Sequence, residues 1–145
     1  MKMRSMPEFF NTWCLSAVVV FGLNNYIWKY QYHNWLTGKL SDLTLCFFLP
    51  LFLSAILSLV TAWSLKLRLA LGSSLTALVF TLVKTSTPIS EYMNIALSSI
   101  TNATGFGASY NIADSTDLVA LPMIAVAWLY ASNFMRKRNE TQFCI

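Results

Sequence analysis

The sequence predicts an all-α membrane protein: a four-transmembrane-helix bundle with a short amphipathic helix in the long outer loop between spans three and four. Three observations support this class. The 145 residues contain four long apolar stretches, only 11% of the chain is charged, and Lys or Arg flanks each stretch. Crossing about 30 Å of hydrocarbon takes roughly 20 mostly apolar helical residues. Four spans are too few for a closed barrel, so we expect helices.

The four stretches form one integral membrane domain over residues 1–145. The second stretch is the clearest, because it contains no charged residue and only Ser and Thr interrupt its apolar content. The first has a competing interpretation as a signal peptide, because Lys2 and Arg4 precede it. Asn24 and Asn25 follow it in place of a small-residue cleavage site, so we expect it to remain as a span. The predicted spans are residues 9–27, 43–65, 67–83 and 118–135.

The basic residues predict the orientation of these spans. Seven of the ten fall on one side of the predicted membrane, and the other three, Lys29, Lys39 and Lys84, fall on the opposite side. Because cytoplasmic loops carry the excess of Lys and Arg, both ends of the chain are expected in the cytoplasm. The net charge of +4 is therefore explained by orientation, and no nucleic-acid partner is expected. The seven are Lys2, Arg4, Lys66, Arg68, Arg136, Lys137 and Arg138.

The outer loop, residues 84–117, is too long for a simple turn. Pro88 after Thr87 indicates a helix start, and apolar residues then recur at intervals of three and four. We therefore expect an amphipathic helix over residues 88–101. Its polar face lacks the basic residues that hold such helices to anionic lipid, which favours docking onto the bundle.

Residues capable of chemistry or recognition gather at the outer ends of spans two and four. Ser41 and Asp42 precede span two, Asp114 and Asp117 precede span four, and Pro50 and Pro122 lie further along and are expected to kink their spans. Ionisable groups at membrane depth usually mark a functional site. The candidates for binding a ligand or partner are Lys39, Asp42, Asp114, Asp117, His33 and Lys84, with His33, Lys84 and Glu91 peripheral.

A purely structural interpretation of the same residues stays open. Asp114 with Asp117 resembles a capping box, and Ser41 with Asp42 suits the positive end of a helix. Lys39 stands three residues before Asp42, which would allow a solvated ion pair worth only about 0 to 1 kcal/mol. Capping and surface pairing would then account for all of them.

The strings Thr37-Gly-Lys-Leu-Ser-Asp42 and Asp114-Ser-Thr-Asp-Leu-Val-Ala-Leu-Pro122 resemble an uncharacterised group of small bacterial four-span inner-membrane proteins. The resemblance covers these two strings, which we call the entrances because each precedes a predicted span, and the helices behind them. It implies a bacterial inner membrane and a shared site at the entrances, and it implies no reaction.

Three functions remain open. The first is a non-enzymatic membrane protein whose polar extracytoplasmic site binds a ligand or another membrane or envelope protein. The second is an intramembrane hydrolase in which Asp42 and Asp117 share a water as base and acid. The third, an oligomeric transporter or pore, is weakest because no charged residue lies in the middle of a span. A homo-oligomer is compatible with each.

No metal or cofactor motif occurs, and we expect neither. The three cysteines, Cys14, Cys46 and Cys144, are too few and too scattered for a disulfide framework, and buried free thiols are the expected state.

Overall fold

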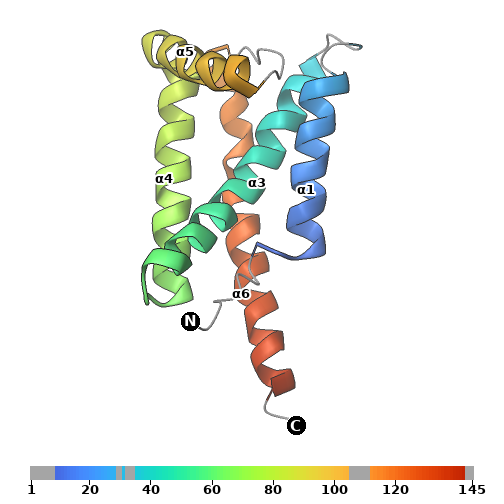
Figure 1. Ribbon diagram of the computed structural model, residues 1–145, viewed down its shortest axis with the longest axis vertical. Coiled ribbons are helices and arrows are strands. Elements are labelled where there is room, and N and C mark those ends of the chain that lie inside the picture. The colour runs from blue at the N-terminus through green and yellow to red at the C-terminus, as the bar shows by residue number, and fades with distance from the viewer. Residues whose placement is uncertain (1–8, 29–30, 32–34, 105–111, 143–145) are drawn as a thin grey trace.

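The computed structural model describes residues 9–28, 31, 35–104 and 112–142, and the regular secondary structure of these residues is helical. Figure 1 shows long helices side by side, with another helix laid across an end of the bundle. The order is α1 (Thr12–Leu23), the π-helical turn η1 (Asn24–Trp28), α3 (Trp35–Val60), α4 (Leu65–Thr85), α5 (Thr87–Thr104), the 3-10 helix η2 (Ser115–Ala120) and α6 (Pro122–Gln142).

Three helical segments are long and apolar enough to cross a membrane: Trp35–Val60, Leu65–Thr85 and Ser115–Phe134. α1 is also apolar but has only 12 residues before its geometry changes to that of η1. The all-α class is thus confirmed, and three such helices indicate a multi-pass membrane protein. The fourth crossing stays a prediction.

α3 is the central helix, because α1, α4 and α6 all pack against it (Figure 1). Its buried face consists largely of small and polar side chains, including Cys46, Ser54, Ala55 and Ser58. Small residues let helices approach closely in lipid, where association depends on packing and interhelical hydrogen bonds. An interhelical bond of this kind joins Arg68 of α4, whose Nη1 donates to the Ser54 carbonyl at 2.9 Å.

α3 and α4 approach each other closely at Gly72. A Cβ atom at this position would lie 2.8 Å from the Pro50 carbonyl oxygen and 3.4 Å from the Leu53 Cβ. Pro50 lies inside α3, as the sequence predicts. Because the obstructing atom is backbone, it cannot turn aside as a side chain would. The absence of a side chain at Gly72 therefore sets the distance between the two helices.

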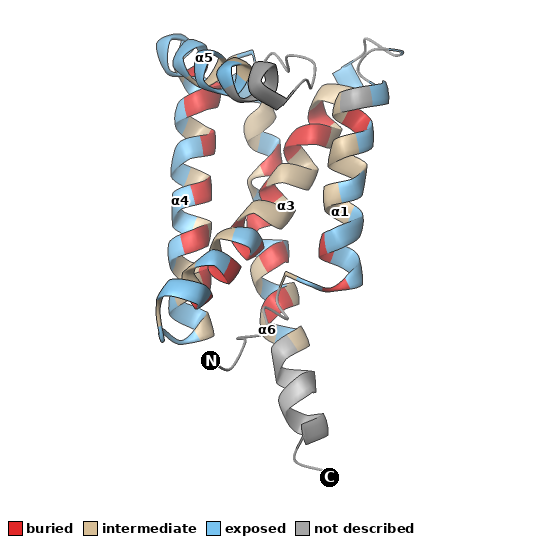
Figure 2. Ribbon diagram, in the orientation of Figure 1, coloured by how far each residue is buried: buried red, intermediate tan, exposed pale blue. Residues whose placement is uncertain are grey.

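Many large apolar side chains are exposed on the helices, whereas several polar side chains are buried between them. Figure 2 shows how the buried and exposed residues are distributed along each helix. Val60 is 80% exposed and Leu78 60% exposed, while Asn24 and Ser54 are completely buried. Large contiguous apolar surfaces are unusual on soluble monomers. This distribution suits contact with a lipid bilayer.

α5 lies across the end of α4, from which Ser86 alone separates it (Figure 1). The helix predicted over residues 88–101 is confirmed and extends from Thr87 to Thr104. Ser90 is buried, whereas Tyr92, which belongs to the predicted apolar stripe, and Ile95 are exposed. α5 thus covers one end of the bundle; we call this the α5 end.

Two predicted boundaries need correction. The second span, predicted over 43–65, is α3, which begins at Trp35 and ends at Val60, because polar residues that find partners lie inside the helix. The fourth, predicted over 118–135, begins with η2 and continues as α6 to Gln142. Pro122 is the first residue of α6, so the kink predicted inside a continuous helix is wrong; the chain changes there from 3-10 to α geometry.

We predict that Gly72→Ala destabilises the bundle by about 1 to 3 kcal/mol, because the new methyl group forces α3 and α4 apart. Thermal unfolding of the detergent-solubilised protein measures the loss. Gly38→Ala is the matched control, since nothing lies within 4 Å of its new Cβ and Ala favours the helix. Equal stability of the two variants would contradict this account of the α3–α4 contact.

Candidate functional site

Four charged side chains from three segments meet at the α5 end of the bundle. Lys39 and Asp42 come from the first turns of α3, Lys84 from the last turn of α4, and Asp117 from η2. We call them the charged quartet. Residues three apart share a helix face, which places Lys39 and Asp42 on the same side of α3. A cation in the last turn of α4 also suits the negative end of the helix dipole.

Positive and negative groups alternate through the charged quartet. The Lys39 Nζ lies 2.7 Å from Asp117 Oδ1, and the Lys84 Nζ lies 2.7 Å from Asp117 Oδ2. The Lys84 Nζ also lies 2.9 Å from Asp42 Oδ2. Asp117 thus bridges the two lysines, and Lys84 bridges the two carboxylates. Lys39 donates a further hydrogen bond to the Thr116 Oγ1 at 2.7 Å.

Three members of the charged quartet are buried, and the side chain of the fourth, Asp117, is 13% exposed. Lys84 is 5% exposed, Lys39 7% and Asp42 8%. A single ion in such surroundings costs several kcal/mol, and removing one partner of a buried pair typically costs 3–5 kcal/mol. Two lysines and two aspartates sum to a formal charge of zero. Each of the four also lies beside a residue of opposite charge. The rings of Trp35 and Phe80 also lie near the Lys39 and Lys84 ammonium groups, at 5.3 and 5.8 Å.

The structure separates the predicted site residues into two groups. Lys39, Asp42, Lys84 and Asp117 come together, and Lys84, which the sequence suggested as peripheral, contacts both carboxylates. Asp114 and Glu91 are exposed and stand apart from the charged quartet. His33 lies outside the described residues.

The structural interpretation holds for Asp114 alone. Its Oδ1 accepts a hydrogen bond from the Thr116 N–H at 2.9 Å, so Asp114 is the N-cap of η2. The N-terminal position expected for Asp42 is wrong, because Asp42 lies within α3. Asp117 does stand in the first turn of η2, as expected, but its carboxylate bonds to two lysines. The solvated pair expected between Lys39 and Asp42 is also wrong, since Lys39 is buried and pairs with Asp117.

A second polar network, which the sequence interpretation missed, adjoins the charged quartet and joins η1 to α3. The Asn24 Nδ2 donates to the Thr37 carbonyl at 2.6 Å and to the Ser41 Oγ at 3.1 Å. The Ser41 Oγ donates to the Asn25 Oδ1 at 3.1 Å. Two consecutive asparagines at the end of an apolar run were the available signal, because buried amides need partners.

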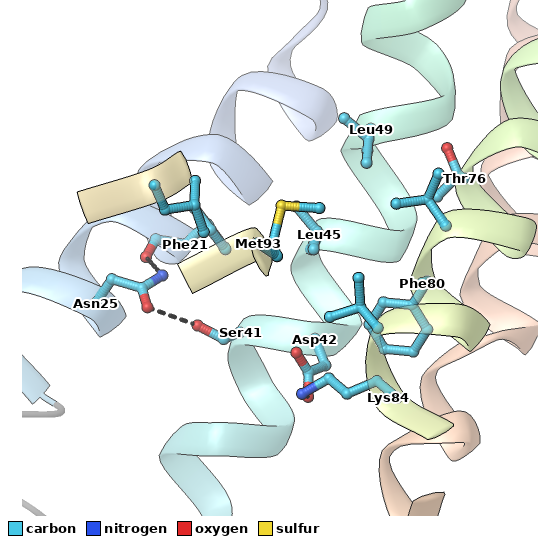
Figure 3. A pocket seen from close by; sticks show the side chains of 13 residues that line it. Phe21, Asn25, Ser41, Asp42, Leu45, Leu49, Thr76, Phe80, Lys84 and Met93 are labelled. Carbon is cyan, nitrogen blue, oxygen red and sulfur yellow. Dashed lines mark hydrogen bonds and ion pairs between the residues drawn. The ribbon is translucent and has the colours of Figure 1, made fainter. Parts of the chain in front are cut away.

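A pocket of about 340 Å³ opens beside the charged quartet, between α1, α3, α4 and α5. Its walls are apolar over most of their extent, with Leu45 and Leu49 from α3 and Met93 from α5. Its polar end carries four side chains, and Figure 3 shows Asp42 and Lys84 pointing toward one another there. The four are Asn25, Ser41, Asp42 and Lys84.

The position of Lys84 limits what the two carboxylates can do. A water shared by Asp42 and Asp117 would need hydrogen-bond reach to both. The Lys84 Nζ is within 3 Å of both carboxylates and so takes that position. Within the described part of the chain, no group of three or more His, Cys, Asp or Glu side chains is arranged to hold a metal ion. The arrangement suits recognition and helix bridging better than activation of water.

We predict that Asp117→Asn costs about 3 to 5 kcal/mol of stability, because it leaves two buried lysines facing one carboxylate. Adding Lys39→Met restores formal neutrality, so the double variant should be more stable than Asp117→Asn alone. Thermal unfolding in detergent gives the comparison. Asp114→Asn is the control: Asn is also a good N-cap and position 114 is exposed, so this change should be nearly neutral. A double variant less stable than Asp117→Asn would contradict the charge-balance argument.

Comparison of the chain with protein-family models, with curated proteins and with solved structures gives no match. The resemblance carried by the two entrance strings therefore stays a prediction.

Proposed function

We propose that this chain is a four-span membrane protein that binds an amphiphilic ligand, without catalysis, in the pocket at its extracytoplasmic end. The observation that carries the proposal is the pocket itself, whose apolar walls lead to a polar end at Asp42 and Lys84. Small-molecule sites are typically concave, mostly apolar, and fitted with a few polar groups that orient the ligand. A volume of about 340 Å³ lies within the usual range for such sites.

The fourth crossing in this proposal is α1 continued by η1. Together they contain 17 residues, which at 1.5 Å each extend roughly 25 Å, close to the thickness of a thin bilayer. Exposed tryptophans mark both ends of this segment, Trp13 at its start and Trp28 at its close. The same pattern brackets α3, between Trp35 and Trp63. Tryptophans at both ends of a span are typical of membrane interfaces.

The excess of basic residues at the two chain ends and at the start of α4 supports a cytoplasmic location for all three. This places the α5 end, and with it the charged quartet, on the extracytoplasmic side. A bacterial inner membrane remains our expectation for the location. The ligand would then approach from the outer leaflet.

Binding is favoured over the hydrolase alternative because Lys84 lies where the shared water would be needed. Transport is disfavoured because the charged quartet lies toward the ends of its helices, and no Asp, Glu, Lys or Arg lies in the middle of the described spans.

The orientation predicts the result of reporter fusions. A reporter active only in the cytoplasm should work at the N-terminus, after Ser64 and after Gln142, and a reporter active only outside should work after Ser86. The positive-inside bias is the physical reason. Cytoplasmic activity after Ser86, or external activity after Ser64, would contradict the proposed topology.

Filling the pocket should abolish ligand binding while leaving the charged quartet intact. Leu49→Trp places a larger ring in the pocket, away from Asp42 and Lys84. We expect lipid-like molecules that co-purify with the wild type in mild detergent to be depleted at least about tenfold, which corresponds to about 1.4 kcal/mol of binding. Mass spectrometry of extracts provides the measurement. Leu78→Trp, on an exposed face of α4, is the matched control. Equal recovery from both variants would argue against a ligand in this pocket.

A further inference from the structure

We infer that the ligand of this pocket is a neutral single-chain amphiphile, with its chain against Leu45 and Leu49 and a hydroxyl- or amide-bearing headgroup at Asp42 and Lys84. The inference rests on the proposed function and specifies its ligand class. It follows from the size of the pocket, the charge balance at its polar end, and the position of its walls.

The size of the pocket favours the hydrocarbon chain of a small ligand, rather than a helix of a partner protein, as its occupant. An α-helix with its side chains is about 10–12 Å across, so a partner helix needs a groove that extends along a bundle. A pocket of about 340 Å³ near one end of the bundle is instead at the lower end of the range for small molecules. A single chain with a small headgroup is the occupant that this space suits.

The charge balance of the quartet selects against a charged headgroup. Lys39, Asp42, Lys84 and Asp117 already sum to zero, and each has an opposite partner. A ligand with a net charge would bring one ion without a partner into a site where Lys39, Asp42 and Lys84 are at least nine-tenths buried. A neutral headgroup avoids this cost.

The polar end retains capacity for one donor and one acceptor. The ion pair of Asp42 uses Oδ2, and the ion pairs of Lys84 use two of its three ammonium protons. The carboxylates of Asp42 and Asp117 also lie within hydrogen-bond reach of each other. Because each carboxylate oxygen has two lone pairs, the described contacts leave one proton of Lys84 and part of the acceptor capacity of Asp42 for a ligand. A hydroxyl or an amide both donates and accepts, so one headgroup can satisfy both.

The walls of the pocket give it a lateral position in the bundle. α1 and α4 lie on opposite sides of α3 (Figure 1), and the pocket is lined from both. Met93 and Leu97 close it from α5 (Figure 3 labels Met93). A single-chain amphiphile that enters here comes from the surrounding lipid, where its hydrocarbon chain already resides.

The test uses three photoreactive probes that share one 12-carbon diazirine-bearing chain and differ only in headgroup. They are a monoacylglycerol, a permanently anionic alkyl sulfonate and a permanently cationic alkyltrimethylammonium. The wild-type protein is labelled in phosphatidylcholine nanodiscs at equal probe fractions, and the modified peptides are mapped by mass spectrometry. We expect the monoacylglycerol to label the peptide containing Leu45 and Leu49 at least about tenfold more than either charged probe.

Two variants define the outcome. Leu49→Trp should remove the labelling by the monoacylglycerol. Asp42→Asn leaves the quartet with a formal charge of +1, so the ratio of sulfonate to monoacylglycerol labelling should rise about tenfold. Size-exclusion chromatography of each variant in nanodiscs confirms that it is folded. If Asp42→Asn is not folded, the selectivity of the wild type between the three probes alone decides the inference.

The failures are distinguishable. Preferential labelling of the pocket by a charged probe would overturn the neutral ligand class and leave the proposed binding function standing. If none of the probes labels the pocket, and Leu49→Trp leaves the labelling unchanged, both the neutral ligand class and the proposed binding function are overturned.

Discussion

The arrangement of this bundle depends on one electrostatic constraint: charges buried at the α5 end must be balanced there. Lys39, Asp42, Lys84 and Asp117 come from α3, α4 and η2, and each ion pair that involves Asp117 or Lys84 joins two of these segments. Since a buried ion without its partner is costly, the three segments cannot separate independently at this end. The charged quartet thus links helices that the hydrophobic effect does not hold together in lipid.

Close packing supplies the other links. Lipid chains are as apolar as leucine, so burying leucine between helices gains little, and contacts between small residues matter more. Gly72 against the backbone of Pro50 brings α3 and α4 together at mid-length, and Arg68 joins them nearer the turn. At the α5 end, Asn24 and Ser41 attach η1 to α3. The polar side chains inside the bundle and the apolar side chains on its surface both follow from the surrounding lipid.

The sequence predicts the helical class, three of the long apolar helices and α5, because these depend on local composition and periodicity. It places the start of α3 too late, since Lys39 and Asp42 look like residues outside a membrane helix until their partners are known. It also makes Lys84 peripheral. Lys84 pairs with Asp117 across 33 residues and with Asp42 in another helix, and no local pattern indicates such a pairing. Sequence reasoning therefore finds the candidates for the site, and only the packing of α4 against α3 and η2 identifies its centre.

Stability and ligand binding share residues in this molecule. Asp42 and Lys84 hold α3 to α4, and the same two side chains form the polar end of the pocket. A ligand that takes the remaining donor and acceptor there adds contacts to the folded state that the unfolded chain cannot make, and so stabilises it by mass action. A ligand that instead displaces the Lys84–Asp42 pair must compensate for the lost pair. A neutral headgroup that bonds alongside the pair is thus the kind of occupant that this bundle accommodates without loosening its own helices.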